Sequence, residues 1–112
     1  MAALTSTVPT AVGVAYVGAA VSSSDTITAA QLGSLGAFLV IIDAGGSPDT
    51  VGYTDPGTTP AGTAAAAYTN TVTNATSEVM YLSPKLVNPS TGLLTITHSF
   101  TTSVTYVLLP IG

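Results

Sequence analysis

The architecture of this chain is set by the run Ala37-Phe38-Leu39-Val40-Ile41-Ile42, which Gly36 precedes and the turn-forming stretch Asp43-Ala44-Gly45-Gly46-Ser47-Pro48 follows. A short, unbroken apolar run rich in β-branched side chains is typical of a strand that is covered on both faces. We therefore predict that residues 37–42 form the central, fully buried strand of a sheet. The same run is uncharged and lacks proline, so it is a steric-zipper hazard if it becomes exposed.

Further short strands are predicted at regular intervals on both sides of this run, with Gly, Pro, Asn and Ser between them. They cover residues 26–28, 50–54, 67–73, 78–82, 93–100 and 104–108, and residues 12–21 are interpreted as a strand in preference to a weak helix. Such spacing indicates an all-β sandwich or barrel.

The segments 93–100 and 104–108 have the clearest alternation of apolar and polar residues. Successive side chains of a strand point to opposite faces, so alternate residues of the first segment share a face. The predicted core face carries Leu94, Ile96, His98 and Phe100, and the other face carries Leu93, Thr95 and Thr97.

The N-terminal residues 1–11 are rich in Thr, contain Pro9 and have no sustained period, which predicts an extended arm. One short helix over residues 29–32 is the alternative to turn structure there, and Asp25 could cap it. The predicted fold class is therefore all-β: a single small antiparallel β-sandwich or barrel over residues 12–112, preceded by an extended N-terminal arm.

Charge is scarce in these 112 residues. Lys85 is the only Lys or Arg, and the five acidic residues are Asp25, Asp43, Asp49, Asp55 and Glu78, so charged residues make up 5% of the chain where about 25% is usual. With one cation the chain cannot neutralise several phosphates, which argues against nucleic-acid binding. A surface with so few charges favours coverage in an assembly.

The chain contains no Cys, so disulfides and cysteine-based zinc sites are excluded. No Lys or Arg precedes the apolar stretch 11–21, so we interpret it as mature sequence and not as a signal peptide. No apolar run reaches the roughly 20 residues that a membrane-spanning helix needs. We expect no membrane association.

His98 is the only histidine, so any catalytic triad or acid-base mechanism has to use it. On a strand face beside Ile96 and Phe100, a lone histidine is more often a hydrogen-bonded residue of the core or an interface. Ser34, in Gly33-Ser34-Leu35-Gly36, lacks the preceding glycine of a nucleophile elbow. We therefore predict no catalytic residues and no enzyme activity.

Asp43, Asp49 and Asp55 could meet around a hard cation, but their spacing fits no calcium loop, and Asp at a turn usually bonds nearby backbone. We predict no metal and no cofactor. Glu78 is interpreted as solvated, Asn74-Ala75-Thr76 as a chance match to a glycosylation site, and Lys85 as unrelated to nucleotide binding because it follows a proline.

Tyrosine is favoured at interfaces, because it combines a large contact area with a polar tip, but it is also an ordinary sheet residue. The sequence leaves both interpretations open for the five tyrosines, Tyr16, Tyr53, Tyr68, Tyr81 and Tyr106.

A sequence pattern over residues 36–109 resembles a family of small capsid decoration, or minor head, proteins encoded near the major capsid gene in phages of actinobacteria. A buried apolar strand, here 38–42, is followed by a Gly-rich turn, a second strand and a Pro-Gly segment, here Asp55-Pro56-Gly57. Later come a strand ending before proline, at Tyr81-Leu82-Ser83-Pro84, and a Gly-tipped turn, Asn88-Pro89-Ser90-Thr91-Gly92, leading into a Thr-rich strand.

This resemblance implies a structural protein on the outer surface of a tailed-phage head, made in the host cytoplasm and bound to the major capsid protein. Self-association is expected, and a trimer would suit the three-fold junctions of a shell. Two alternatives stay open: a carbohydrate- or cell-surface-binding β-sandwich, which predicts a cleft with convergent aromatic residues, and a low-copy tail or head-completion protein.

Overall fold

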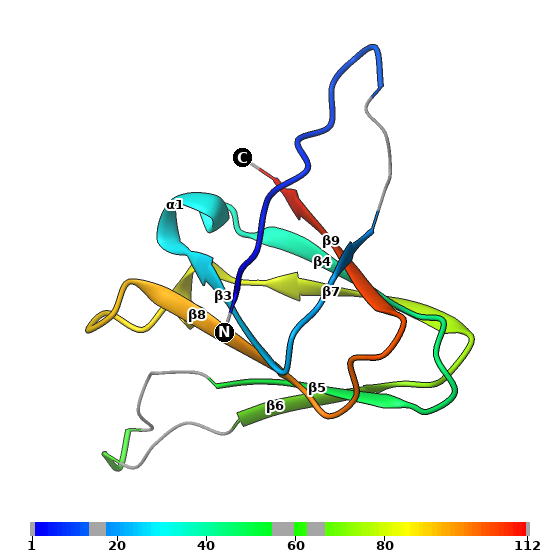
Figure 1. Ribbon diagram of the computed structural model, residues 1–112. Helices are drawn as coiled ribbons and strands as arrows, with labels where there is room; N and C mark the ends of the chain where they lie inside the picture. The colour runs from blue at the N-terminus through cyan, green and yellow to red at the C-terminus, as the bar shows by residue number, and fades with distance from the viewer. Residues whose placement is uncertain (1, 14–17, 55–59, 63–66, 112) are drawn as a thin grey trace.

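The computed structural model describes residues 2–13, 18–54, 60–62 and 67–111 (Figure 1). Nearly all of its regular structure is strand, so the prediction of an all-β chain is confirmed. The described elements are β1 (Ala2–Ala3), β2 (Ala19–Ala20), β3 (Ser24–Thr28), α1 (Ala29–Leu32), β4 (Ala37–Asp43), β5 (Asp49–Thr54), β6 (Ala67–Val72), β7 (Thr76–Leu82), a 3-10 helix (Pro84–Leu86), β8 (Leu93–His98) and β9 (Val104–Pro110).

The strands pair as one long hairpin that is rolled up. β2 pairs with β9, β3 with β8, β4 with β7 and β5 with β6, all antiparallel, so the first half of the hairpin runs back along the second. Rolling adds two antiparallel pairs, β4 with β9 and β5 with β8. The result is a sheet with the order β1-β3-β8-β5-β6, called sheet A, and a sheet with the order β2-β9-β4-β7, called sheet B.

This strand order is that of a jelly roll, in which eight antiparallel strands form two packed sheets with Greek-key connections. Figure 1 shows the two layers, with β4, β7 and β9 in one and β5, β6 and β8 in the other. Of the two predicted forms, sandwich and barrel, the chain takes the sandwich.

The core lies between the two sheets and is almost entirely aliphatic. The predicted core face of β8 is confirmed, because Leu94, Ile96 and His98 are buried while Thr95 and Thr97 are exposed. Phe100 packs against the core from the turn after β8. Each sheet contributes to the buried aliphatic set, which includes Ile27, Leu39, Ile41, Val51, Val72, Leu82, Leu94, Ile96, Val104 and Leu108.

β4 is the central strand of its sheet, between β7 and β9, as predicted. The prediction that it is fully buried is wrong. Leu39 and Ile41 point inward and have no exposed surface, but Phe38 points outward and is 43% exposed, and Val40 and Ile42 are half-buried. The unbroken apolar run predicts two covered faces, whereas only the face that packs against sheet A is fully covered.

Residues 2–7 close one side of the sandwich. β1 pairs in parallel with β3 in sheet A, and the chain then crosses to sheet B, where Thr7 N donates to Leu108 O at 2.7 Å. Leu4 lies between these two contacts and is only 5% exposed. The predicted arm therefore runs along the edge of its own domain over this segment, and the exposed residues 8–13 then lead away from the sandwich (Figure 1).

The short helix predicted over residues 29–32 is present as α1. Thr28 caps it: Thr28 Oγ1 accepts a hydrogen bond from Gln31 N at 3.2 Å, and Gln31 Oε1 accepts one from Thr28 N at 2.9 Å. This is a capping box, which satisfies two otherwise free amides. The alternative in which Asp25 caps the helix is wrong, because Asp25 lies within β3 and is buried.

The strand predicted over residues 12–21 is confirmed only at Ala19–Ala20. Gly13 has a φ of +87° and its N donates to Thr10 O at 3.0 Å, so the chain turns where the prediction continued a strand. Residues 14–17 lie outside the described residues. The remaining predicted strands agree with the structure to within two residues at most ends.

Candidate functional site

His98 is buried between two carboxylates. Its Nδ1 lies 2.6 Å from Asp49 Oδ2 and its Nε2 lies 3.8 Å from Asp25 Oδ2. All three side chains are at most 1% exposed. A carboxylate only accepts hydrogen bonds, so Nδ1 carries the hydrogen and donates to Asp49. This Asp25–His98–Asp49 cluster links β3, β8 and β5 on the core side of sheet A.

Each carboxylate of the cluster also holds a turn. Asp49 Oδ1 accepts hydrogen bonds from Ser99 N at 3.0 Å and from Phe100 N at 3.2 Å, where the chain leaves β8. Asp25 accepts hydrogen bonds from Ser22 N, at 3.1 Å, and from the Ser22 hydroxyl, just before β3. Buried charges need such partners. The cluster therefore fixes the positions at which two turns meet sheet A.

The cluster does not have the geometry of a nucleophilic site. Ser22 bonds to Asp25 and not to His98, both ring nitrogens of His98 face carboxylates, and burial leaves a substrate no path to the ring. His98 is thus a hydrogen-bonded residue on the core face, as its strand position predicts. Ser34 lies exposed in the turn after α1.

The pairing of Asp25 and Asp49 with His98 was not predicted from the sequence. A signal was present, because Asp25 shares a strand face with Ile27, and Asp49 shares one with Val51. Each acid therefore lies on the apolar, inward face of its strand. The three residues are far apart in sequence, so bringing them together also requires the strand order.

The three acids considered for a cation do not meet among the described residues. Asp43 ends β4 in sheet B, Asp49 begins β5 in sheet A, and Asp55 lies outside the described residues. Asp43 Oδ1 accepts a hydrogen bond from Gly45 N at 3.0 Å, the usual role of an Asp at a turn. In the part of the chain that the structure describes, no three His, Cys, Asp or Glu side chains form a group that could hold a metal.

The remaining polar candidates lie at the surface. Glu78 is half-buried within β7, so its interpretation as a solvated residue holds only in part. Asn74 is exposed in the turn between β6 and β7. Lys85 is exposed in the 3-10 helix, where its backbone N donates to Ser83 Oγ at 3.2 Å.

The tyrosines fall into three environments. Tyr106 is 6% exposed, and its hydroxyl accepts a hydrogen bond from Thr5 N at 2.9 Å, so it anchors the N-terminal segment. Tyr81 is 51% exposed on the outside of sheet B. Tyr53 and Tyr68 lie together on sheet A, and Tyr16 lies outside the described residues.

The outside of sheet B is a broad apolar surface without charge, called here the outer apolar face. Strand register arranges it in three rows, Leu109-Phe38-Tyr81, Val107-Val40-Val79 and Thr105-Ile42-Ser77. All but Thr105 and Ser77 are apolar or aromatic. Phe38, Tyr81 and Val79 are 43%, 51% and 63% exposed, so the face is open along β4 and β7, whereas Val107 on β9 is only 2% exposed and is covered.

The aromatic end of the outer apolar face is held in place. The rings of Phe38 and Tyr81 meet edge to face with their centroids 6.1 Å apart, and the Tyr81 hydroxyl donates to Leu35 O at 2.9 Å. Gly36 has a φ of +87°, and a Cβ there would lie 3.0 Å from the Tyr81 ring. The backbones of Leu35 and Ile111 lie beside this end, through Leu35 O on the Tyr81 hydroxyl and Ile111 N on Gly36 O at 3.1 Å, and the two residues are 56% and 42% exposed.

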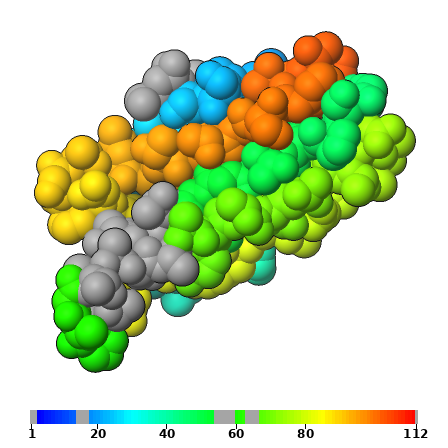
Figure 2. Space-filling view, turned by 90° about the horizontal axis from the view of Figure 1, so that it is seen from below, coloured from blue at the N-terminus to red at the C-terminus, as the bar shows by residue number. Residues whose placement is uncertain are grey.

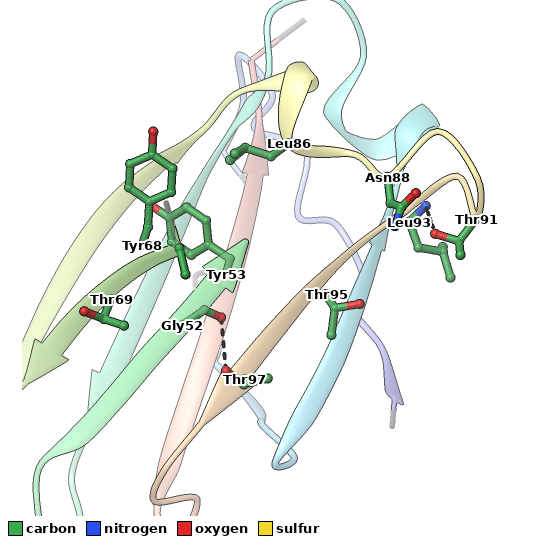
Figure 3. A pocket seen from close by; sticks show the side chains of 11 residues that line it. Gly52, Tyr53, Tyr68, Thr69, Leu86, Asn88, Thr91, Leu93, Thr95 and Thr97 are labelled. Carbon is green, nitrogen blue, oxygen red and sulfur yellow. Dashed lines mark hydrogen bonds between the residues drawn. The ribbon is translucent and has the colours of Figure 1, made fainter. Parts of the chain in front are cut away.

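A hollow of about 460 Å³ opens on sheet A where β5 and β8 separate (Figure 3). Their pairing ends at Tyr53 and Ile96. Before that point, Leu93 at the start of β8 forms a bridge with Asn88 and accepts a hydrogen bond from Asn88 N at 3.0 Å. Figure 2 shows the bands of β3, β8, β5 and β6 across this sheet. The hollow is lined by Gly52, Tyr53, Ala67, Tyr68, Thr69, Leu86, Asn88, Thr91, Leu93, Thr95 and Thr97.

Tyr53 and Tyr68 pair across β5 and β6 and stack, with ring centroids 5.4 Å apart and planes at 21°. Tyr68 is 50% exposed, whereas Tyr53 is half-buried. Burial raises the pKa of the Tyr53 hydroxyl above its ordinary value of 10.0, and the neighbouring Tyr68 raises that pKa further.

Comparison with known proteins gives no relative: no family model, no curated protein and no solved structure matches this chain. Over the described residues, the structure contains no helix with the length and apolar character needed to cross a membrane. The chemistry and shape of the described surfaces are therefore the basis for proposing a function.

Proposed function

We propose that this chain is a structural virion protein: a capsid decoration, or cement, protein that binds the outer surface of a tailed-phage head and stabilises the shell. The observation that carries the proposal is the outer apolar face. β4 has the composition of a strand covered on both faces, yet its outer face is only partly covered: Phe38 is 43% exposed, and Val40 and Ile42 are half-buried. A second molecule that packs on this face would supply the missing layer.

The low charge of the chain supports the same proposal. Free proteins keep apart through mixed surface charges, and interfaces that stay covered resemble a domain core cut in half. The outer apolar face carries no charged residue in its three rows, so burying it against a shell removes water from apolar groups without leaving a charge unpaired. Many copies on one shell would make weak individual contacts strong together.

The jelly-roll topology is in keeping with this role, since the fold occurs in viral capsid domains, but it also occurs in lectins and cupins. Fold alone does not decide function. The outer apolar face is therefore the feature that supports this role, and we expect its partner surface to belong to the major capsid protein. Contacts between copies, as in a trimer around a three-fold junction, would use the remaining surface.

An extended N-terminal arm is a natural candidate for strand addition to a capsid protein or to a neighbouring copy, but this proposal assigns the segment to its own domain. Leu4 N and Thr7 N already donate to Thr26 O and Leu108 O of the same chain, at 2.9 and 2.7 Å. Strand addition to a capsid protein would have to break these bonds or use only the exposed residues 8–13. In this proposal the segment completes the domain, and the outer apolar face makes the contact with the shell.

The first test is the copy number of this protein relative to the major capsid protein in purified particles, by quantitative mass spectrometry. Decoration of the whole shell predicts a copy number of the same order as that of the capsid protein. A few copies per particle would indicate the tail or head-completion role instead, and absence from particles would contradict a virion role.

The second test places a charge on the outer apolar face. Val79→Asp is expected to lower occupancy on undecorated particles by more than ~10-fold, because an unpaired carboxylate would be buried at the contact. Thr71→Asp is the matched control, since it adds the same charge at an exposed strand position on the other sheet. Circular dichroism confirms that both variants fold, and equal occupancy of the two variants would contradict the proposed docking face.

A further inference from the structure

The hollow on sheet A is chemically unlike the outer apolar face and shares no lining residue with it, so the proposed shell contact leaves it free. Figure 3 places the two tyrosine rings on one side, Asn88, Thr91 and Leu93 on the other, and Gly52 and Thr95 between them. Its volume of about 460 Å³ is within the range of small-molecule sites, which is roughly 300–1,000 Å³.

The tyrosines form an aromatic wall of fixed orientation. Tyr53 is packed against the core and stacks on Tyr68, so the half-exposed Tyr68 ring is supported from behind. A supported, exposed ring offers a flat apolar surface with a polar hydroxyl at its edge. Pyranose rings, which carry C–H groups on a face and hydroxyls at their rims, complement this shape.

The opposite wall offers neutral hydrogen-bonding groups. Asn88 Oδ1 accepts from Ser90 N at 2.9 Å, which orients the side-chain amide and leaves its NH₂ available to donate. Thr91 Oγ1 accepts from Leu93 N at 3.3 Å, and its hydroxyl hydrogen stays available. Asn88 and Thr91 therefore present oriented hydrogen-bond donors across the hollow from the two tyrosine rings.

Gly52 lines the hollow and lies close to the neighbouring strand β8. A Cβ at this position would lie 2.9 Å from Thr97 Oγ1, a distance that real Cβ atoms do not tolerate. The Thr97 hydroxyl donates a hydrogen bond to Gly52 O at 3.3 Å, so its oxygen can still accept one.

The absence of charge among the lining residues indicates which class of ligand the hollow would bind. None of the lining residues named above carries a charge, so a charged ligand would lose water without gaining a counter-charge. A purely apolar ligand would leave the amide and hydroxyl groups unsatisfied. We infer that the hollow is a binding site for a neutral carbohydrate, with the Tyr68 ring packing on the sugar face and Asn88 and Thr91 bonding its hydroxyls.

This inference does not depend on the decoration role. A protein bound to a shell through sheet B would present the sheet A hollow outward, toward the glycans of a cell surface, but the hollow could bind sugar equally well in the free protein. Loss of sugar binding and loss of shell binding are therefore separate outcomes, measured on variants of opposite sheets.

The test begins with the full chain on an array of neutral and acidic glycans, followed by calorimetry with the best neutral trisaccharide. We expect a neutral hit with a Kd of ~1 mM or tighter. Tyr68→Ala should weaken binding ~10-fold or more, whereas Tyr81→Ala, which removes an equally exposed tyrosine from sheet B, should leave it unchanged.

Three results would overturn the inference: an array without neutral hits, hits confined to acidic glycans, or equal binding by the Tyr68→Ala protein. Asn88→Ala provides a second variant that removes no packing from the core, because Asn88 is exposed. This substitution should also weaken sugar binding, and an unchanged affinity would show that Asn88 does not contact the sugar.

Discussion

Asp49 receives hydrogen bonds from three consecutive residues of the segment that ends β8. His98 Nδ1 donates to Oδ2, and Ser99 N and Phe100 N donate to Oδ1. Since the carboxylate is buried, removing it leaves the imidazole and two amides without their acceptor. A single side chain thus determines how the last turn of the sandwich begins.

Asp49→Ala is accordingly expected to lower the free energy of unfolding by ~3–5 kcal/mol, measured by urea denaturation. Glu78→Ala is the control, because Glu78 is only half-buried and should change stability by less than ~1 kcal/mol. Similar losses in the two variants would show that the buried cluster does not stabilise the fold.

Tyr53 gives a stability change at alkaline pH. Its folded-state pKa is raised, first by burial and then by Tyr68, so the fold favours the neutral hydroxyl. This contribution is complete below the ordinary pKa of 10.0 and is lost as pH rises through the folded pKa. Between neutral pH and about pH 11, the wild-type protein should lose more stability than Tyr53→Phe. Parallel loss in both proteins would contradict the assignment.

Among the elements, the N-terminal segment is the one whose role the sequence indicated least. Its lack of period predicts an arm, and parallel pairing of two residues with β3 leaves no pattern in sequence. By contrast, β8 and β9 alternate clearly and were predicted within two residues of their ends. A strand sequence alternates between apolar and polar residues where one face of the strand is buried and the other is exposed to solvent, as in β8.

Leu4→Ala should lower the free energy of unfolding by ~2–5 kcal/mol, because Leu4 fills the side of the sandwich between β3 and β9. Val8→Ala is the neighbouring control, since Val8 is 61% exposed and its loss should cost less than ~0.5 kcal/mol. Thermal unfolding of the two proteins measures the difference. An arm that merely lies on the surface would make them equal.

For the whole molecule, composition predicts an all-β sandwich, but the order of strands follows from long-range register. Nothing local pairs β2 with β9 or Val51 with His98. Because strand order cannot be predicted locally, the sites were predicted only in part. The strand position of His98 predicts that it lies on the core face, but its pairing with two acids follows only from the strand order. The same holds for the hollow, where the strand order brings Tyr53 and Tyr68 together with Asn88.

The central place of β4 also has a consequence during synthesis. The strands that flank it, β7 and β9, lie C-terminal to it, so the ribosome releases β4 first. Until β9 emerges, the most aggregation-prone run of the chain has at least one unpaired backbone edge. Truncated products that end before residue 104 would keep that edge open. They are therefore the species in which this sequence forms intermolecular strands most readily, and full-length chains protect the run by pairing β9 with it.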